Sequence, residues 1–206
     1  MKVRTRGESR REQILDISEE FFASRGFDDT NLDLVANRLG LKRQAIYYYF
    51  PSKDAILVEL VERAGGALHD AVMPTFASDL APREKLAKVL INHVEHVLEN
   101  PVSFRVQFSE VRRMAPESIA KVRSDEQTYI KHVAGVIEEG QRAGELLDGP
   151  PVPMALVLVG MCNGTLEWFQ PGRHMSISDI AELAVSIVMD GMVTKSPVPV
   201  RRASAH

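Results

Sequence analysis

The chain has 206 residues, of which 45% are hydrophobic, so its length and composition suit one or two domains with a sizeable core. Its formal net charge of -3 argues against a generic binder of polyanions, and its single cysteine excludes an internal disulfide and a cysteine-based zinc finger. Neither an N-terminal apolar segment nor a run of about eighteen apolar residues is present, so we expect a cytoplasmic protein without a membrane partner.

Helical periodicity runs through most of the chain, and alternation typical of strands is scarce. We therefore expect an all-α fold of about nine helices. The first nine residues, MKVRTRGES, are polar and basic and are expected to be disordered. A first helix is predicted over residues 10–25, because Ile14, Phe21 and Phe22 share an apolar stripe and Gly26 stands just past the last turn.

Two short helices joined by a tight turn are predicted between residues 30 and 50, which read TNLDLVANRLGLKRQAIYYYF. The first is expected to begin at Thr30, because Thr30 followed by Asp33 resembles a capping box. Gly40 follows the last apolar residue of that helix, where a left-handed backbone closes the helix without a steric penalty. This pattern predicts a helix-turn-helix.

The second of these helices has a clear inner and outer side. Leu41, Ile46 and Phe50 are expected to point inward, and Tyr49 is expected to pack with them. The side chains left on the open side are those of Arg43, Gln44, Ala45, Tyr47 and Tyr48. Residues 38–53 carry four basic residues and no acidic one, whereas residues 56–206 are net acidic. The basic footprint is therefore local to this helix.

A connecting helix is predicted from Asp54 onward, interrupted at Gly65 and Gly66 and ended by Pro74. The two glycines are explained either by a hinge or by a close helix crossing that needs small residues. Further helices are predicted at 82–100, 116–143, 154–169 and 178–194, with a short aromatic-rich segment after Pro101. The helix over 154–169 is apolar nearly all round, so it must be covered on both sides.

These patterns divide the chain into three predicted parts. Residues 1–55 form a helix-turn-helix domain with a basic N-terminal arm, residues 56–195 a helical domain, and residues 196–206 a disordered tail. Ser178 is expected to cap the last helix, whose stripe suits a paired helical interface.

The segment from Ile14 to Leu57 resembles the DNA-binding domain of the TetR family of bacterial transcriptional regulators. The resemblance covers about residues 10–57 and includes the Phe-x-x-x-Gly-Phe element, the Tyr-Tyr-x-Phe run and the start of the next helix at Ser52-Lys53. Lys42 departs from the family, which often opens the recognition helix with a hydroxyl residue, so the cap must come from elsewhere or the first turn is frayed. The C-terminal segment 160–192 resembles regulators of fatty-acid and related lipid catabolism.

The resemblance implies a homodimer that reads a palindromic double-stranded DNA operator. Arg43 suits guanine and Gln44 suits adenine, because each presents paired groups that match those base edges. Ala45 is implied to touch a thymine methyl, Tyr47 a base or phosphate, and Thr30, Tyr48 and Lys53 phosphates. The residues implied to bind DNA are Thr30, Lys42, Arg43, Gln44, Ala45, Tyr47, Tyr48 and Lys53.

The family also has an effector-binding C-terminal domain that dimerises through its last two helices. Apolar residues with arginines near a mouth are expected to form the effector pocket, and these are Phe104, Arg105, Phe108, Arg112, Met114, Val133, Ile137, Met161 and Trp168. The alternative for each of them is ordinary core packing or a solvated face. The residues expected in the dimer interface are Leu158, Met161, Thr165, Ile180, Leu183, Ala184, Ile187 and Val188.

The function that follows is a ligand-responsive repressor released from its operator by a small apolar effector, an acyl-CoA thioester being the candidate. The alternatives are a regulator of drug efflux or of another catabolic operon with a different apolar effector, or an activator. A DNA-coating protein is disfavoured by the acidic body and the base-reading residue types. No cofactor is expected.

An enzyme is the main rival class. The sequence contains no Gly-rich phosphate loop, no Ser nucleophile elbow and no His-Glu-x-x-His motif, so no catalytic site is expected. His93, His96 and Glu99 follow one another at three-residue spacing and suit the start of a metal site, but no clear further ligand accompanies them. We therefore expect these histidines to be packing or solvent-exposed residues and expect no metal.

Overall fold

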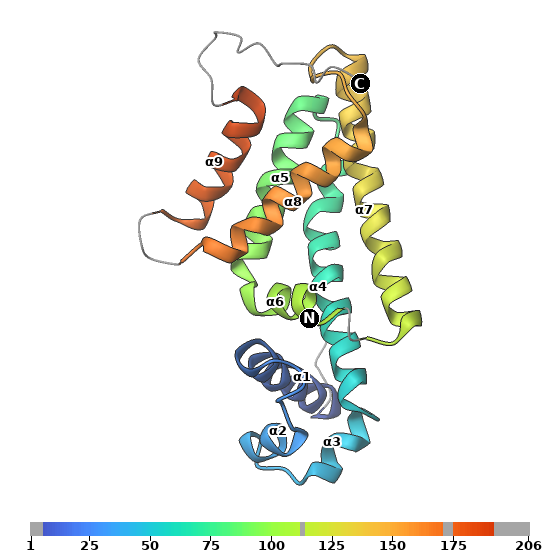
Figure 1. Ribbon diagram of the computed structural model, residues 1–206, viewed down its shortest axis with the longest axis vertical. Helices are drawn as coiled ribbons and strands as arrows, with labels where there is room; N and C mark the ends of the chain where they lie inside the picture. The colour runs from blue at the N-terminus through green and yellow to red at the C-terminus, as the bar shows by residue number, and fades with distance from the viewer. Residues whose placement is uncertain (1–5, 112–113, 171–174, 192–206) are drawn as a thin grey trace, which may run out of the picture.

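A computed structural model describes residues 6–111, 114–170 and 175–191, and these residues form nine α-helices, which confirms the predicted all-α fold (Figure 1). The helices are α1 (Arg6–Arg25), α2 (Leu32–Arg38), α3 (Arg43–Tyr49), α4 (Lys53–Phe76), α5 (Pro82–Glu99), α6 (Pro101–Glu110), α7 (Pro116–Arg142), α8 (Pro151–Trp168) and α9 (Ile177–Asp190). Helices α1 to α3 form a small head at one end of the molecule, and α4 leads from that head into a larger helical body (Figure 1). Within the described ranges, every helix is too short or too polar to span a bilayer.

The head is held by one apolar cluster to which all of its helices contribute. Ile14, Phe22, Val35, Ile46 and Phe50 are each at most 2% exposed, and the inward side predicted for the second short helix is confirmed. Residues 6–9 belong to α1, so the predicted disorder of the first nine residues is wrong for this part, and residues 1–5 lie outside the described ranges.

The turn between α2 and α3 follows the predicted glycine geometry, but the start of α2 does not follow the predicted cap. Gly40 has a φ of 66°, in the left-handed region that glycine tolerates. The cap of α2 is Asn31, whose side chain accepts a hydrogen bond from the Asp33 backbone N–H at 2.9 Å. The predicted start at Thr30 is therefore wrong by two residues, because an adjacent residue with equal capping ability takes the position.

Helix α4 is continuous from the head into the body, so the predicted break at Gly65-Gly66 is wrong. A Cβ at either glycine would meet no atom within 4 Å, which also excludes a close helix crossing as their explanation. Pro74 lies inside the last turn of α4 instead of ending it. Ile56, Leu60 and other residues buried along one side of α4 supply the packing that outweighs the low helix propensity of two glycines.

The body is organised around α5, against which α4, α7, α8 and α9 all pack. Its core cluster includes Leu90, Val94, Val133, Ile137 and Cys162, all fully buried. Helix α8 begins three residues earlier than predicted, because prolines are tolerated in a first helical turn. Helix α9 begins at Ile177 with a capping box between Ser176 and Asp179, so Ser178 is not its cap, and the helix ends at Asp190 instead of residue 194.

The head and the body are joined by both apolar and charged contacts. Val106 of α6 and Met114 pack in the same cluster as the α1 and α4 side chains of the head. Arg63 of α4 donates to the carboxylates of Asp16 and Glu19 on α1, and its pKa stays raised by these partners although burial opposes it. Both α4 and α6 therefore contact α1 directly.

Candidate functional site

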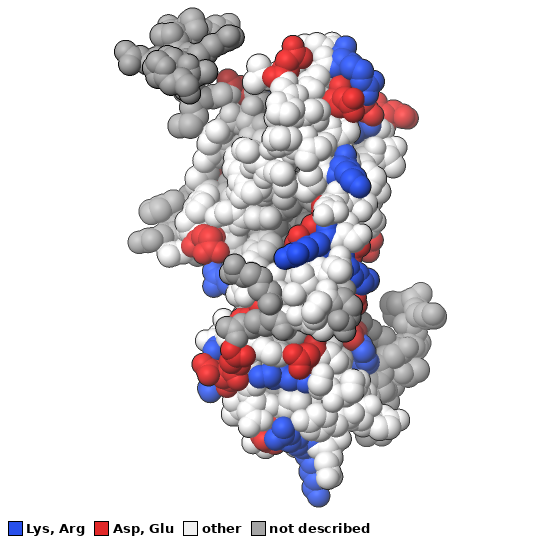
Figure 2. Space-filling model, turned by 45° about the vertical axis from the view of Figure 1, so that its right-hand side comes forward, with Lys and Arg blue, Asp and Glu red and all other residues white. Residues whose placement is uncertain are grey.

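The outer surface of the head is formed by α3, which turns a row of polar and aromatic side chains away from the core. Lys42, Arg43 and Gln44 are exposed, Tyr47 is 40% exposed and Tyr48 is 85% exposed. Ala45 is half-buried and Tyr49 packs against the head cluster. On the face shown in Figure 2, Lys and Arg atoms protrude at the lower tip of the molecule, the end that α2 and α3 form in Figure 1. This surface has the residue types that read bases in a DNA groove.

Arg43 does not extend freely from α3 but is held by two neighbours. Its Nη1 donates to Asp33 Oδ2 of α2 at 3.0 Å, and its Nη2 and Nε donate to the Tyr47 hydroxyl at 3.0 and 3.3 Å. The guanidinium lies 5.6 Å from the centre of the Tyr47 ring. The hydrogen bond to Tyr47, followed by the charge of Asp33, raises the pKa of Arg43. The side chain is half exposed, so it remains accessible to DNA.

Lys42 occupies the N-cap position of α3 and provides no side-chain hydrogen bond there. The prediction that the recognition helix lacks a cap from this residue is confirmed. The first turn of α3 is instead tied to α2 through Arg43, the first helical residue, and Asp33.

Two residues predicted to hold phosphates have other roles in this structure. Thr30 is 1% exposed, and its hydroxyl donates to the Gly26 carbonyl at 2.8 Å. The Lys53 ammonium donates to the carbonyls of Phe27, Asp28 and Thr30 at 2.6, 3.3 and 3.0 Å, so its donors are engaged by the loop between α1 and α2. The burial of Thr30 contradicts its predicted phosphate contact, because this residue closes the loop from within. The phosphate contact of Lys53 stays a prediction, and in this structure Lys53 anchors the loop to α4.

The body contains a groove of about 330 Å³ between α4, α6 and α7, referred to below as the effector groove. Gly65 and Gly66 line its α4 side, and Val122 and Tyr129 line its α7 side. Gln107 reaches it from α6 and is 8% exposed, and its Oε1 is buried without a hydrogen-bond partner in the described part of the chain. A buried unpaired amide oxygen is costly, so this atom is suited to bond a ligand.

The residues predicted to line one effector pocket do not come together in this groove. Met114 packs in the head cluster, Phe104 and Phe108 in a small cluster with Leu166, and Val133, Ile137 and Met161 in the body core. Trp168 is 58% exposed on α8 and Arg105 is exposed on α6, whereas Arg112 lies outside the described residues. The prediction of a shared cavity is therefore wrong for these residues, because helical spacing does not distinguish a pocket wall from core packing.

A second cavity of about 470 Å³ lies at the far end of the body, between α5, α7, α8 and α9. Its walls are almost entirely apolar and include Ile137, Met154 and Val188. Two polar residues lie at its edge: Arg83 pairs with Asp190 at 2.9 Å, and Glu145 accepts from the Arg83 backbone N–H at 3.1 Å.

The outward sides of α8 and α9 form an apolar surface at the edge of the body. Of the predicted interface residues, Leu183 and Ile187 are 44% and 37% exposed, and Leu158, Met161 and Val188 are half-buried. Thr165, Ile180 and Ala184 are buried against the chain itself, which corrects their assignment to the interface. Leu156 and Val157, which the prediction missed, are 55% and 71% exposed. A patch of this kind marks an interaction surface.

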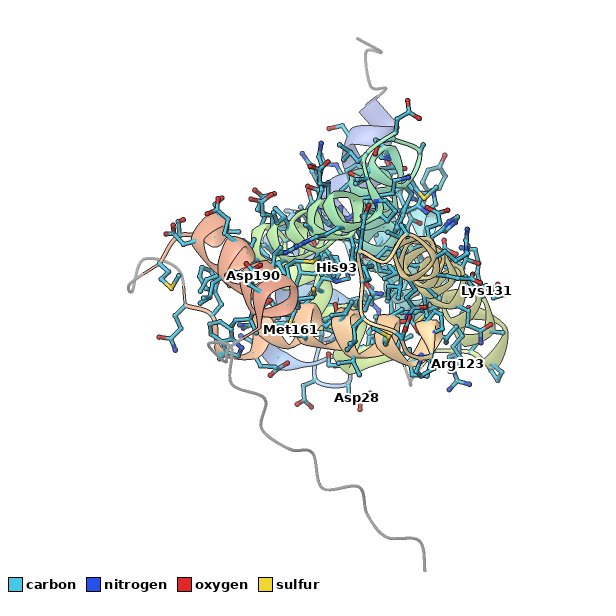
Figure 3. The ribbon with its side chains drawn as sticks, turned by 90° about the horizontal axis from the view of Figure 1, so that it is seen from above. Asp28, His93, Arg123, Lys131, Met161 and Asp190 are labelled. Carbon is cyan, nitrogen blue, oxygen red and sulfur yellow. The ribbon has the colours of Figure 1, made fainter. Side chains whose placement is uncertain are left out.

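His93 lies in the middle of the helical body, whereas Arg123, Lys131 and Asp190 lie at its edges (Figure 3). Its Nδ1 accepts from the Tyr129 hydroxyl at 2.8 Å and its Nε2 donates to Asn163 Oδ1 at 2.8 Å. Burial lowers the pKa of His93 to about 4, so the ring is neutral. Among the described residues, no group of three or more His, Cys, Asp or Glu side chains is placed to hold a metal ion.

The head and the body each match a known protein family model. Residues 14–60 match the family model described as bacterial regulatory proteins, tetR family, and residues 79–192 match the tetracyclin repressor-like C-terminal domain. The chain belongs to the TetR family. It is accordingly a transcriptional regulator with a helix-turn-helix, which confirms the resemblance found in its sequence.

Relatives within the TetR family include a repressor and a regulator named for fatty acid metabolism. The chain is 25% identical to the HTH-type transcriptional repressor KstR2 of Rhodococcus jostii, over 92% of this chain and 95% of that protein. It is 23% identical to the fatty acid metabolism regulator protein of Bacillus subtilis, over 89% and 95% of the two chains. The solved structure of AibR in complex with isovaleryl coenzyme A and operator DNA has the same fold, with a TM-score of 0.81 at 16% identity over 87% and 98% of the chains.

The effector groove was missed from the sequence although one signal pointed to it. Two adjacent glycines within an otherwise amphipathic helix weaken that helix, so a structural reason for them is expected. In the structure, both glycines border open space beside α4 and line the groove.

Proposed function

We propose that the chain is a dimeric repressor that reads a palindromic operator with its two copies of α3 and leaves it when an apolar effector occupies the effector groove. The observation that carries this proposal is the outward row on α3, where Arg43, Gln44 and Tyr48 are exposed above a buried Ile46 and Phe50. Arg43 pairs with guanine and Gln44 with adenine, and each such pair contributes about 1–3 kcal/mol of discrimination.

Dimerisation through α8 and α9 supplies the two-fold symmetry that a palindromic operator requires. Leu156 and Val157 on α8 and Leu183 and Ile187 on α9 are exposed apolar side chains on this surface. A second copy that packs its own α8 and α9 here removes these side chains from water and places a recognition helix on each half of the operator.

The operator proposal is tested by footprinting the purified protein on the DNA upstream of its own gene. A bounded footprint that contains an inverted repeat is expected, because a dimer contacts two half-sites. Arg43→Ala is expected to lower discrimination at one base pair in each half-site. Equal losses of affinity on operator and random DNA would contradict a base-reading role for Arg43.

The effector proposal is supported by the position of the groove between the head-contacting helices. Helix α4 continues into the head, and Val106 of α6 packs against the head cluster. A ligand between α4, α6 and α7 therefore pushes on both connections at once. Release follows if the ligand binds more tightly to an arrangement whose two heads no longer fit the operator spacing.

An acyl-CoA thioester is the effector that we propose, because the relatives include a fatty acid metabolism regulator and AibR is known in complex with isovaleryl coenzyme A. The acyl chain suits the apolar part of the groove lining, which includes Val61, Leu68 and Val122, and Gln107 is suited to bond a polar group on the ligand. Titration of the protein–operator complex with acyl-CoAs of increasing chain length tests this. Release is expected within a range of chain lengths, whereas no release at any length refutes the lipid effector and leaves the repressor intact.

The groove itself is tested by filling it. Gly66→Leu places a side chain in open space beside the groove, so DNA binding is expected to persist while effector release is lost. Gly135→Leu is the matched control, because Gly135 is also a helical glycine whose Cβ position has no atom within 4 Å and does not line the groove. Equal effector release by both variants would show that the ligand binds elsewhere.

A further inference from the structure

The side chain that the proposed function assigns to base reading is held by residues from two helices. Asp33 lies on α2, ten positions before Arg43, and its carboxylate accepts from Nη1 at 3.0 Å. Tyr47 lies one turn after Arg43 on α3, and its hydroxyl accepts from both Nε and Nη2. The guanidinium is therefore fixed on two of its sides before any DNA arrives.

The number of hydrogen-bond donors on Arg43 shows what this arrangement leaves open. A guanidinium has five N–H groups, and Asp33 and Tyr47 engage three of them. One N–H therefore remains on Nη1 and one on Nη2. Two parallel donors from the terminal nitrogens are what the O6 and N7 atoms of guanine accept in the major groove. The neighbours of Arg43 thus leave one N–H on each terminal nitrogen available to a base edge.

Asp33 also restrains the start of α3, which has no side-chain cap. Lys42 provides no side-chain hydrogen bond to the start of α3, so this first turn lacks the usual restraint. Arg43 is the first residue of α3, and its bond to Asp33 ties that turn to α2. A long, flexible arginine side chain loses rotamer entropy when it is ordered, so restraint before binding reduces the conformational entropy that is lost on binding DNA.

We propose that Asp33 is a positioning residue for operator recognition, which orients Arg43 toward guanine, and that the Tyr47 hydroxyl supports the same orientation. The inference rests on the proposed base-reading role of Arg43. The competing possibility is that Asp33 merely holds Arg43 back from DNA, in which case its removal strengthens binding to every sequence. The positioning role predicts that removing Asp33 lowers discrimination, whereas the competing role predicts a gain of affinity that leaves discrimination unchanged.

The experiment measures equilibrium binding to the footprinted operator and to the same DNA with the guanine read by Arg43 replaced in one half-site. The variants are Asp33→Ala, Asp33→Asn, Tyr47→Phe and Arg43→Ala, together with the Asp33→Ala and Arg43→Ala double variant. Asp33→Asn retains an acceptor oxygen, and the capping bond from the Asp33 backbone N–H to Asn31 does not depend on the Asp33 side chain. Circular dichroism of each variant establishes that the head is folded.

Arg43→Ala is expected to lower the ratio of the two affinities by roughly 5- to 150-fold, the loss of one bidentate contact. Asp33→Ala is expected to lower the same ratio by at least about fivefold, because it acts on the Arg43–guanine contact. Asp33→Asn and Tyr47→Phe are expected to give ratios between those of the wild type and Asp33→Ala. In the Arg43→Ala background, Asp33→Ala is expected to leave the ratio unchanged within about twofold, because it acts only through Arg43.

An equal gain or an equal loss of affinity for both DNAs in Asp33→Ala overturns the positioning role while Arg43 keeps its own. An unchanged ratio in Arg43→Ala overturns the base-reading role in the proposed function, and the inference falls with it. The two failures are thus distinguished by which variant leaves the ratio unchanged.

Discussion

The head and the body of this regulator place their candidate sites in different ways. The recognition surface of the head comes from two seven-residue helices close together in the sequence, and its side chains point outward. The effector groove of the body is lined by α4, α6 and α7, whose lining residues span positions 61 to 129. A site on adjacent short helices follows from local pattern, whereas a site between distant helices depends on how those helices pack.

Both regions have a buried apolar core, but they differ in the polar contacts that accompany it. In the head, capping and loop contacts add to the core, among them Asn31 at the start of α2 and Lys53 across the α1–α2 loop. In the body, His93 is a buried polar residue beside the apolar core. The head is therefore expected to respond to the loss of single polar contacts as well as of packing, and the body to the loss of packing or to buried charge.

The largest expected effect comes from the apolar surface of the body. Leu183→Glu places a carboxylate on the outward side of α9, so the dimer is expected to dissociate and operator affinity to fall by roughly 10²- to 10⁴-fold as the second head is no longer linked. Sedimentation equilibrium and mobility-shift titration measure both. Val102→Glu is the control, since Val102 is 38% exposed on α6, outside the α8 and α9 surface, and this variant is expected to leave the dimer intact. A dimeric Leu183→Glu would place the interface elsewhere.

The next effect concerns the buried histidine of the body. The folded pKa of His93 is about 4, below its ordinary value of 6.5, so protons bind preferentially to the unfolded chain between these values. This group's contribution is present above pH 6.5 and is lost as the pH falls toward 4, amounting to about 3 kcal/mol of unfolding free energy. Urea unfolding is measured from pH 7 to pH 4, and the unfolding free energy is expected to fall less steeply with decreasing pH in His93→Gln than in the wild type. Identical slopes would show that His93 does not resist protonation.

A smaller effect distinguishes two roles of Lys53 in the head. Lys53→Met keeps the stem beside Phe27 but removes the ammonium that bonds three carbonyls, so the unfolding free energy is expected to drop by about 2 kcal/mol. The salt dependence of DNA binding is expected to stay the same. If the slope of log binding constant against log salt concentration instead flattened by about 0.9 while stability stayed unchanged, Lys53 would contact a phosphate. Lys42→Met, an exposed lysine without such bonds, serves as the stability control.

The smallest effect concerns the start of α2. Asn31→Ala removes the side chain that caps this helix, so the unfolding free energy is expected to fall by about 1 kcal/mol. Asn37→Ala is the matched control because Asn37 is exposed in the last turn of the same helix. Chemical denaturation of both variants measures the difference, and equal midpoints would remove Asn31 from the capping role.

Several helix starts show how precisely sequence patterns predict where a helix begins. Ser176 and Asp179 form a capping box that is legible in the sequence, yet Ser178, two residues later, is an equally acceptable cap by residue type. Thr30 and Asn31 present the same choice at α2. Neighbouring capping residues differ little in free energy, so the packing of the helix decides between them.

The all-α fold, the helix-turn-helix and the outward row from Arg43 to Tyr48 can be predicted from the chain alone, because each depends on helical periodicity within a few turns. Three features require the packed structure: which side of α8 faces outward, that Gly65 and Gly66 border a groove, and that Lys53 is engaged by loop carbonyls. A helix that is apolar all round carries no internal signal of its buried side, and a groove exists only where separate helices leave space. Both are set by long-range packing, which local spacing does not record.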